Sequence, residues 1–121
     1  MGNVHNICVV GAGRWGLNHV RTLEELGSLG GVVDENSLVT NKIKLKYPGC
    51  VVFNSLEKSF DKNFDGYIVA TPPITHYEIS KKIIENNKPL LVEKPLTLKL
   101  DDAIKLNKLA KRKNVNLMVG H

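Results

Sequence analysis

The feature of this sequence that most restricts its fold is a glycine-rich turn that directly follows a short apolar run. Residues 7–10 read Ile-Cys-Val-Val, a run typical of a buried parallel strand, and residues 11–16 read Gly-Ala-Gly-Arg-Trp-Gly. A G-x-G-x-x-G turn between a strand and a helix indicates a dinucleotide-binding unit. A simple turn is the alternative interpretation, because glycines cluster in ordinary turns as well.

Each glycine of this turn has a separate physical role in a dinucleotide-binding unit. Gly11 permits the tight turn, Gly13 lets the backbone approach a pyrophosphate, and Gly16 lets the following helix pack close to the strand. The N-terminus of that helix offers N–H donors and the positive end of its dipole to the phosphates. We therefore expect a pyrophosphate to bind at this turn.

The rest of the chain alternates apolar runs with stretches of helical periodicity. Further strands are expected at residues 29–33, 50–53, 67–70, 90–92 and 115–119, separated by helices at 17–26, 36–46, 56–60, 75–84 and 101–113. Strands that alternate with helices predict an α/β fold with a parallel sheet covered on both faces. We expect a doubly wound, Rossmann-type sheet in the order 3-2-1-4-5-6, with residues 1–121 forming one domain.

Local signals predict where several helices begin and end. Gly27 and Asn87 suit the left-handed residue that ends a helix. Thr75 and Glu78 have the spacing of a capping box, which predicts the start of the fourth helix. The apolar side chains of the second helix that are expected to face the core are Leu38, Ile43 and Leu45.

Asp34 is a second signal for a dinucleotide. It ends the second expected strand, roughly 20 residues after the first glycine, where an acidic residue binds the adenosine ribose. A carboxylate there would repel a 2′-phosphate, so this position favours NAD over NADP. The alternative is that Asp34 only begins a turn. Glu35 either shares the ribose role or belongs to the first turn of the next helix.

Composition argues against several other classes of protein. The chain has 17 Lys and Arg against 12 Asp and Glu, but the basic residues are spread over the expected helices, so we expect no nucleic-acid partner. We expect no membrane partner either, because no apolar run is long enough to span a membrane, and the N-terminus lacks the pattern of a signal peptide. Cys8 and Cys50 match no disulfide framework or metal motif and are expected to be buried apolar residues. These observations predict a cytoplasmic protein.

A loop with two prolines follows the fourth expected strand. Ligands of open α/β sheets bind at the carboxyl ends of the strands, so Thr71, Pro72 and Pro73 are expected to line the cofactor site. The prolines would otherwise only begin a helix. His76 either forms hydrogen bonds at the start of that helix or faces the cofactor.

Glu93, Lys94 and Pro95 follow the fifth expected strand at the same edge of the sheet. Pro95 favours an extended conformation at Lys94. A lysine at this position could hydrogen-bond a substrate hydroxyl and help to move its proton as hydride leaves. An ordinary surface lysine is the alternative.

Four segments together resemble a known family. They are residues 11–16, Ala-Thr-Pro-Pro-Ile-Thr-His at 70–76, Val-Glu-Lys-Pro-Leu at 92–96 and Met-Val-Gly-His at 118–121, in this order and at matching separations. The chain resembles the N-terminal domain of the Gfo/Idh/MocA oxidoreductases, the glucose–fructose oxidoreductase and inositol dehydrogenase family. The ends of the chain resemble members that act on nucleotide-linked sugars such as UDP-N-acetylglucosamine or its uronic acid.

The resemblance implies a role for each matching residue. Gly11, Gly13 and Gly16 would hold the pyrophosphate of NAD(H), with backbone contacts from Arg14 and Trp15, and Asp34 would bind the adenosine ribose. Thr71, Pro72 and His76 would lie along the cofactor towards the nicotinamide ribose. Glu93 and Lys94 would lie beside the nicotinamide, with Lys94 contacting the substrate hydroxyl as the catalytic residue. No metal is implied.

The resemblance also implies a second domain, which nothing after His121 provides. In the family that domain supplies most of the substrate pocket, the catalytic histidine and the usual oligomer face. His5 and His19 are expected to be surface or helix-packing residues and not replacements for it. We therefore expect an NAD-dependent oxidoreductase domain for a sugar or nucleotide-sugar that has little activity alone. The alternative is a truncated, non-enzymatic NAD(H)-binding remnant or sensing module. An apolar face left open where the second domain docks would permit self-association.

Overall fold

The computed structural model describes residues 5–120, and the end of the Met-Val-Gly-His segment, His121, lies outside the described residues. Within residues 5–120 the elements are β1 (Ile7–Val10), α1 (Arg14–Leu26), β2 (Leu29–Val33), α2 (Ser37–Lys46), β3 (Val51–Phe53), α3 (Leu56–Ser59), η1 (Phe60–Lys62), β4 (Gly66–Val69), η2 (Pro73–Thr75), α4 (His76–Glu85), β5 (Leu90–Glu93), α5 (Leu100–Lys113) and β6 (Leu117–Gly120). The strands lie within a residue or two of the expected ranges, as is normal for element ends.

All strand pairs are parallel, and the order across the sheet is β3-β2-β1-β4-β5-β6. The doubly wound, Rossmann-type prediction is therefore confirmed. The chain crosses from β1 outward to β3 and then returns to place β4 on the other side of β1. Because the direction of winding reverses there, the carboxyl ends of β1 and β4 diverge and leave a crevice between them.

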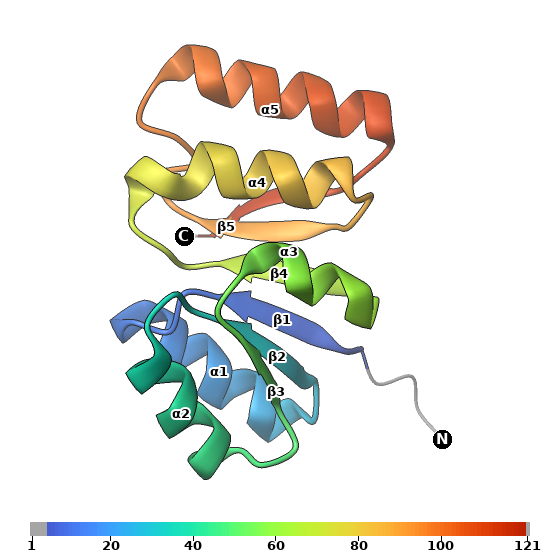
Figure 1. Ribbon diagram of the computed structural model, residues 1–121. Helices are drawn as coiled ribbons and strands as arrows, with labels where there is room; N and C mark the ends of the chain where they lie inside the picture. The colour runs from blue at the N-terminus through green and yellow to red at the C-terminus, as the bar shows by residue number, and fades with distance from the viewer. Residues whose placement is uncertain (1–4, 121) are drawn as a thin grey trace.

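Helices cover both faces of the sheet, as Figure 1 shows. One core contains Val9, Val20 and Ile43 and lies between the sheet and helices α1 and α2. The other core, under α3, α4 and α5, includes Val10 and the buried aromatic ring of Tyr67. Successive residues of β1 point into opposite cores, which is why its sequence is a continuous apolar run and not an alternating one.

The two glycines in β2 have a packing role. A Cβ at Gly31 would lie 2.5 Å from the Phe64 ring, and one at Gly30 would lie 1.8 Å from the side-chain oxygen of Asn6. Phe64 is 1% exposed and packs edge-on against Tyr67. The glycines therefore weaken the intrinsic strand propensity of β2 but create the space that this aromatic cluster fills.

Two local predictions on the helices are wrong. Leu38 is 72% exposed and Leu45 is 84% exposed, so only Ile43 of the three predicted residues faces the core. These two leucines are seven residues apart and lie on one side of α2, whereas the sheet buries the side that carries Thr40 and Ile43. The periodicity of the sequence predicted the helix correctly, but it did not identify which side of the helix the sheet covers.

The capping box at Thr75 is also wrong. The Thr75 hydroxyl donates to the Pro72 carbonyl at 2.6 Å and lies 2.6 Å from the Thr71 hydroxyl, and it makes no cap bond to α4. A 3-10 turn, η2, precedes α4 and already gives Thr75 a helical conformation, so the extended geometry of a capping residue is absent there. The other predicted helix ends are confirmed, because Gly27 and Asn87 have positive φ values of 73° and 61°.

No helix within residues 5–120 combines the length and the apolar character that crossing a membrane requires.

Candidate functional site

A pocket of about 820 Å³ opens at the carboxyl edge of the sheet, at the crevice between β1 and β4. Its walls come from the glycine turn, the ends of β2 and β4, the loop after β3 and one side of α4. The lining residues are Val10, Gly11, Gly13, Arg14, Trp15, Val33, Asp34, Glu35, Asn54, Ser55, Leu56, Glu57, Ala70, Thr71, Pro72, Pro73, Thr75, Ile79 and Lys82. The structure thus brings together most of the residues that the sequence singled out.

The glycine turn has the geometry that its sequence predicts. Gly11 has a φ of +93°, a conformation that L side chains rarely adopt, and a Cβ on it would lie 2.8 Å from Thr71. A Cβ on Gly16 would lie 1.8 Å from the Gly11 carbonyl oxygen, so only glycine lets α1 start this close to β1. Among the described residues, nothing lies within 4 Å of a Cβ on Gly13, which therefore faces open space. This open backbone is suited to close approach by a phosphate.

Asp34 lies at the end of β2 and contacts the glycine turn. Its carboxylate accepts one hydrogen bond from the Ala12 main-chain N–H and another from the Asn36 main-chain N–H, each at 2.9 Å. These bonds hold the carboxylate in the pocket in one orientation. Since each carboxylate oxygen can accept two hydrogen bonds, each keeps one acceptor position for a ligand hydroxyl.

Asn54 is a site residue that the sequence analysis missed. Its side-chain amide donates to the Asp34 carbonyl at 2.8 Å and to the Thr40 hydroxyl at 3.2 Å. Asn54 directly follows β3, so its position at the carboxyl end of an expected strand was the signal that could have identified it. The amide links the loop after β3 to the loop after β2 and completes this wall of the pocket.

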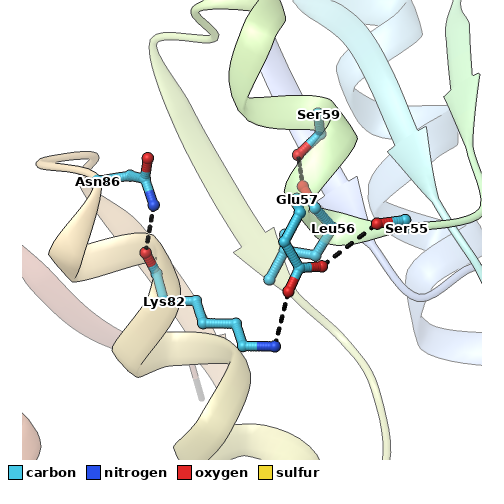
Figure 2. A network of polar contacts seen from close by, with 6 residues as sticks. All are labelled: Ser55, Leu56, Glu57, Ser59, Lys82 and Asn86. Carbon is cyan, nitrogen blue, oxygen red and sulfur yellow. Dashed lines mark hydrogen bonds and ion pairs between the residues drawn. The ribbon is translucent and has the colours of Figure 1, made fainter.

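An ion pair between α3 and α4 borders the pocket. Lys82 on α4 reaches the Glu57 carboxylate on α3 at 2.7 Å, and the Ser55 hydroxyl donates to the same carboxylate at 3.2 Å, as Figure 2 shows. Hydrogen bonding to Lys82 lowers the pKa of Glu57, and the reciprocal bond raises the pKa of Lys82. Both side chains are about half exposed, so the pair is a solvated link between α3 and α4.

The loop after β4 places Thr71 and Pro72 on the pocket wall, as expected, but His76 is not among the residues that line the pocket. His76 is 1% exposed, with Nδ1 2.8 Å from the Pro95 carbonyl oxygen and Nε2 2.8 Å from the Thr71 carbonyl oxygen. Of the two roles left open for His76, this geometry matches hydrogen bonding at the start of α4. Both ring nitrogens are engaged with main-chain carbonyls and not with the pocket.

Glu93 and Lys94 lie at the end of β5, beyond the residues that line the pocket. Lys94 is exposed, and its bond to Pro95 is cis. The Glu93 carboxylate forms a hydrogen bond with the His19 ring of α1, and both side chains are about one quarter exposed. This partnership was missed, because His19 lies on a helix far from Glu93 in sequence and only the fold brings them together.

The two cysteines are buried, as expected. Burial raises the pKa of the Cys8 thiol and raises the pKa of Cys50 to about 11. Across residues 5–120, no three His, Cys, Asp or Glu side chains form a group that could hold a metal ion.

Comparison with known proteins gives a consistent result. The sequence profile of the Gfo/Idh/MocA family, described as an oxidoreductase family with an NAD-binding Rossmann fold, matches residues 5–121. Inositol 2-dehydrogenase of Mycolicibacterium smegmatis is 34% identical over 102 residues, which are 81% of this chain and 30% of that protein. UDP-N-acetylglucosamine 3-dehydrogenase of Acidithiobacillus ferrooxidans is 27% identical over 113 residues, or 93% of this chain and 36% of that protein.

A solved structure agrees at the level of the fold. The structure of GenD2 from gentamicin A biosynthesis in complex with NAD has a TM-score of 0.92 and 30% identity. The match covers 99% of this chain and 35% of that chain. This chain therefore spans about a third of the length of the proteins that it resembles.

Proposed function

Because the chain belongs to the Gfo/Idh/MocA oxidoreductase family, with its NAD-binding Rossmann fold, we propose that its pocket binds NAD(H) for a dehydrogenase of sugars or nucleotide-sugars. The observation that carries the proposal is the pairing of Asp34 with the glycine turn. The Asp34 carboxylate accepts from the Ala12 main-chain N–H in the glycine turn, and Asp34 lines the same pocket as the open backbone of Gly13. A ribose and a pyrophosphate need these two elements side by side.

The charge of the pocket favours NAD(H) over NADP(H) in this proposal. Asp34 and Glu35 both line the pocket at the end of β2, where the adenosine ribose would bind. A 2′-phosphate there would meet two carboxylates, whereas the hydroxyls of an unmodified ribose would donate to Asp34. Arg14 and Trp15 also line the pocket, at the start of α1 beside the glycine turn, and are suited to contact the pyrophosphate.

The order of the strands across the sheet indicates where each part of the proposed cofactor would lie along the carboxyl edge. With the ribose at β2 and the pyrophosphate at β1, the adenine lies near the loop after β3 and the nicotinamide lies towards β4 and β5. Thr71 and Pro72 then border the nicotinamide ribose, and Glu93 and Lys94 lie next to the ring. When bound, the nicotinamide supplies hydride transfer. Lys94, exposed at the end of β5, would hydrogen-bond the substrate hydroxyl and share its proton.

The names of the relatives support a sugar-like substrate. The two relatives reported above are named for the oxidation of UDP-N-acetylglucosamine and of inositol, both of which are polyhydroxylated rings with a secondary alcohol. We propose a substrate of this class, with its secondary alcohol placed between Lys94 and the nicotinamide.

A second candidate function is binding of NAD(H) without turnover, in a sensing module. It is favoured by the composition of the pocket, since its lining comes from β1 to β4 and α4 and does not include Glu93 or Lys94. The pocket can therefore hold the adenosine and pyrophosphate independently of the residues proposed for chemistry. Oxidation of an added polyol or nucleotide-sugar, followed as NADH formation, would favour the dehydrogenase over the module.

Calorimetric titration with NADH tests the proposal that both functions share. We expect saturable binding to the wild-type chain and a loss of roughly tenfold or more in Asp34→Ala, since a hydrogen bond to a charged group is removed. Glu24→Gln, an exposed carboxylate on α1, is the matched control and should bind as the wild type does. Absence of binding to the wild-type chain at millimolar NADH, or equal affinity in Asp34→Ala, would overturn the proposal.

A further inference from the structure

The residues on either side of Lys94 are each held by a histidine from a different helix. Glu93 is paired with His19 of α1, and the Pro95 carbonyl contacts the ring of His76 on α4. Neither histidine lines the pocket. The arrangement places one anchor immediately before Lys94 and another immediately after it, from opposite faces of the sheet.

His19 holds Glu93 from the face of the sheet that α1 covers. The carboxylate can only accept, so Nε2 of His19 donates to Oε1 of Glu93. Glu93 is the last residue of β5, and its main chain is in register with Gly120 of β6. A Cβ at Gly120 would lie 3.8 Å from the Glu93 carboxylate, so the side chain is confined between His19 and β6.

His76 holds Pro95 from the face that α4 covers. Nδ1 of His76 lies 2.8 Å from the Pro95 carbonyl oxygen, and Nε2 lies 2.8 Å from the Thr71 carbonyl oxygen. A carbonyl oxygen only accepts, so a ring N–H is the donor wherever either hydrogen bond forms. The same ring therefore ties the turn at residues 93–95 to the loop after β4. That loop contributes Thr71 and Pro72 to the pocket wall.

We propose that His19 and His76 are positioning residues that hold the turn at residues 93–95 so that the Lys94 amine lies against the nicotinamide of the bound cofactor. This proposal rests on the proposed function, because it assumes that NAD(H) binds with its nicotinamide towards β5. A lysine side chain has four rotatable bonds and is mobile on a surface. Fixing the backbone on both sides of Lys94 restricts where the amine can reach, which a group that must meet a reacting hydroxyl requires.

The test measures the position of Lys94 directly. Lysines of the whole chain are reductively methylated alone, with saturating NADH or with saturating ADP-ribose, and the rate at each lysine is followed by peptide mass spectrometry. ADP-ribose lacks the nicotinamide but retains every other part that the pocket would bind. We expect NADH to slow labelling of Lys94 by roughly three- to tenfold, the scale of one net hydrogen bond, and ADP-ribose to leave it unchanged. Exposed Lys58, which does not line the pocket, is the internal control.

Two pairs of variants separate positioning from stability. His19→Gln retains a donor near the position of Nε2, whereas His19→Leu removes it. His76→Asn retains a donor near Nδ1 for the Pro95 carbonyl, whereas His76→Gln retains one near Nε2 for the Thr71 carbonyl. In His19→Gln and His76→Asn we expect NADH to slow the labelling of Lys94 as it does in the wild type. In His19→Leu and His76→Gln we expect NADH to leave the labelling rate of Lys94 unchanged. All four variants should still bind ADP-ribose.

The outcomes are distinguishable from failure of the proposed function. If neither NADH nor ADP-ribose binds the wild-type chain, the proposed function fails and this inference fails with it. If both bind but NADH leaves Lys94 unprotected, or if protection persists in His19→Leu and His76→Gln, the inference is wrong and the proposed function stands. If the variants of buried His76 misfold and lose ADP-ribose binding, the comparison of His19→Gln with His19→Leu tests the inference, because His19 is partly exposed.

Discussion

The Asp34 carboxylate at the end of β2 accepts a hydrogen bond from the main-chain N–H of Ala12, in the glycine turn at the end of β1, at 2.9 Å. Two adjacent strand ends are thereby linked by a side chain that also faces the pocket. A substitution at position 34 that removes the acceptor is therefore expected to be destabilising, because Ala12 is 3% exposed and its N–H would lose its partner. The residue proposed to bind the ribose thus also supports the turn proposed to bind the pyrophosphate.

This relationship predicts the effect of neutralising Asp34 on the choice of cofactor. Asp34→Asn retains an acceptor for the Ala12 N–H but removes the charge that would repel a 2′-phosphate. We expect the preference for NADH over NADPH, measured as the ratio of dissociation constants by calorimetry, to fall by roughly tenfold, the scale of one charged hydrogen bond. An unchanged ratio would show that Asp34 does not face the 2′ position. Glu35→Gln tests whether the neighbouring carboxylate shares this role.

The glycine turn predicts opposite results for two alanine substitutions. Gly16→Ala would place a Cβ 1.8 Å from the Gly11 carbonyl oxygen, so α1 must shift, and we expect a loss of about 1–3 kcal/mol in unfolding free energy. At Gly13 a Cβ meets only open space among the described residues, so Gly13→Ala should unfold at nearly the wild-type urea concentration. It should nevertheless bind NADH more weakly, because the methyl group would occupy the space proposed for the pyrophosphate. Equal stability of the two variants would contradict this packing.

The Glu57–Lys82 pair predicts a small, salt-sensitive dependence of stability on pH. The pKa of Glu57 is lowered in the fold, chiefly by its hydrogen bond to Lys82, so its contribution is present above the unfolded pKa and is lost as pH falls through the folded value. Solvent exposure limits this contribution to about 0.2–1 kcal/mol. Urea unfolding of wild type and Glu57→Gln should therefore differ at pH 7, converge towards pH 3, and differ less in molar salt. The pKa of Lys82 is raised, so its own contribution is lost only at strongly alkaline pH.

The buried cysteines predict slow reaction with thiol reagents. The pKa of Cys50 is raised to about 11, chiefly by burial, and burial also raises the pKa of Cys8, so both thiols remain protonated at pH 8. Because burial favours the neutral thiols, the free energy of unfolding is highest below the pKa that cysteine has in the unfolded chain. It falls as pH rises from that value towards the raised pKa of the folded chain. With Ellman's reagent at pH 8 we expect little reaction before urea is added and two thiols per chain afterwards. Rapid labelling of the native chain would contradict the burial of β1 and Cys50.

Much of the fold could be predicted from the sequence because the signals were local. The apolar run at residues 7–10, the glycine turn and Asp34 lie in one continuous βαβ unit, and their spacing reflects the length of one strand, one helix and the next strand. The strand order was expected because alternating strands and helices predict a doubly wound sheet, for which 3-2-1-4-5-6 is the usual order of a dinucleotide-binding fold. Gly11 and Gly16 could be assigned roles for the same reason, since both act within their own turn.

The partners of His19 and His76 could not be predicted, because they come from elements far apart in the chain. His19 meets Glu93 only because the sheet places β5 beside β4 and β1 under α1. His76 meets Pro95 only after α4 has packed against the loops at the ends of β4 and β5. The exposure of Leu38 and Leu45 has the same origin, since the sheet and not the helix decides which side of α2 is covered.

The sequence by itself determined the class of fold, the order of the strands, the position of the glycine turn and the acidic residue at the end of β2. These depend on periodicity and short spacings, which backbone geometry imposes on any chain. The tertiary structure alone decided that Asn54 joins the pocket wall, that Glu57 and Lys82 pair at its border, and that two histidines contact the residues on either side of Lys94. Those contacts join side chains brought within hydrogen-bonding distance by the packing of helices on the sheet, and a linear sequence does not contain that distance.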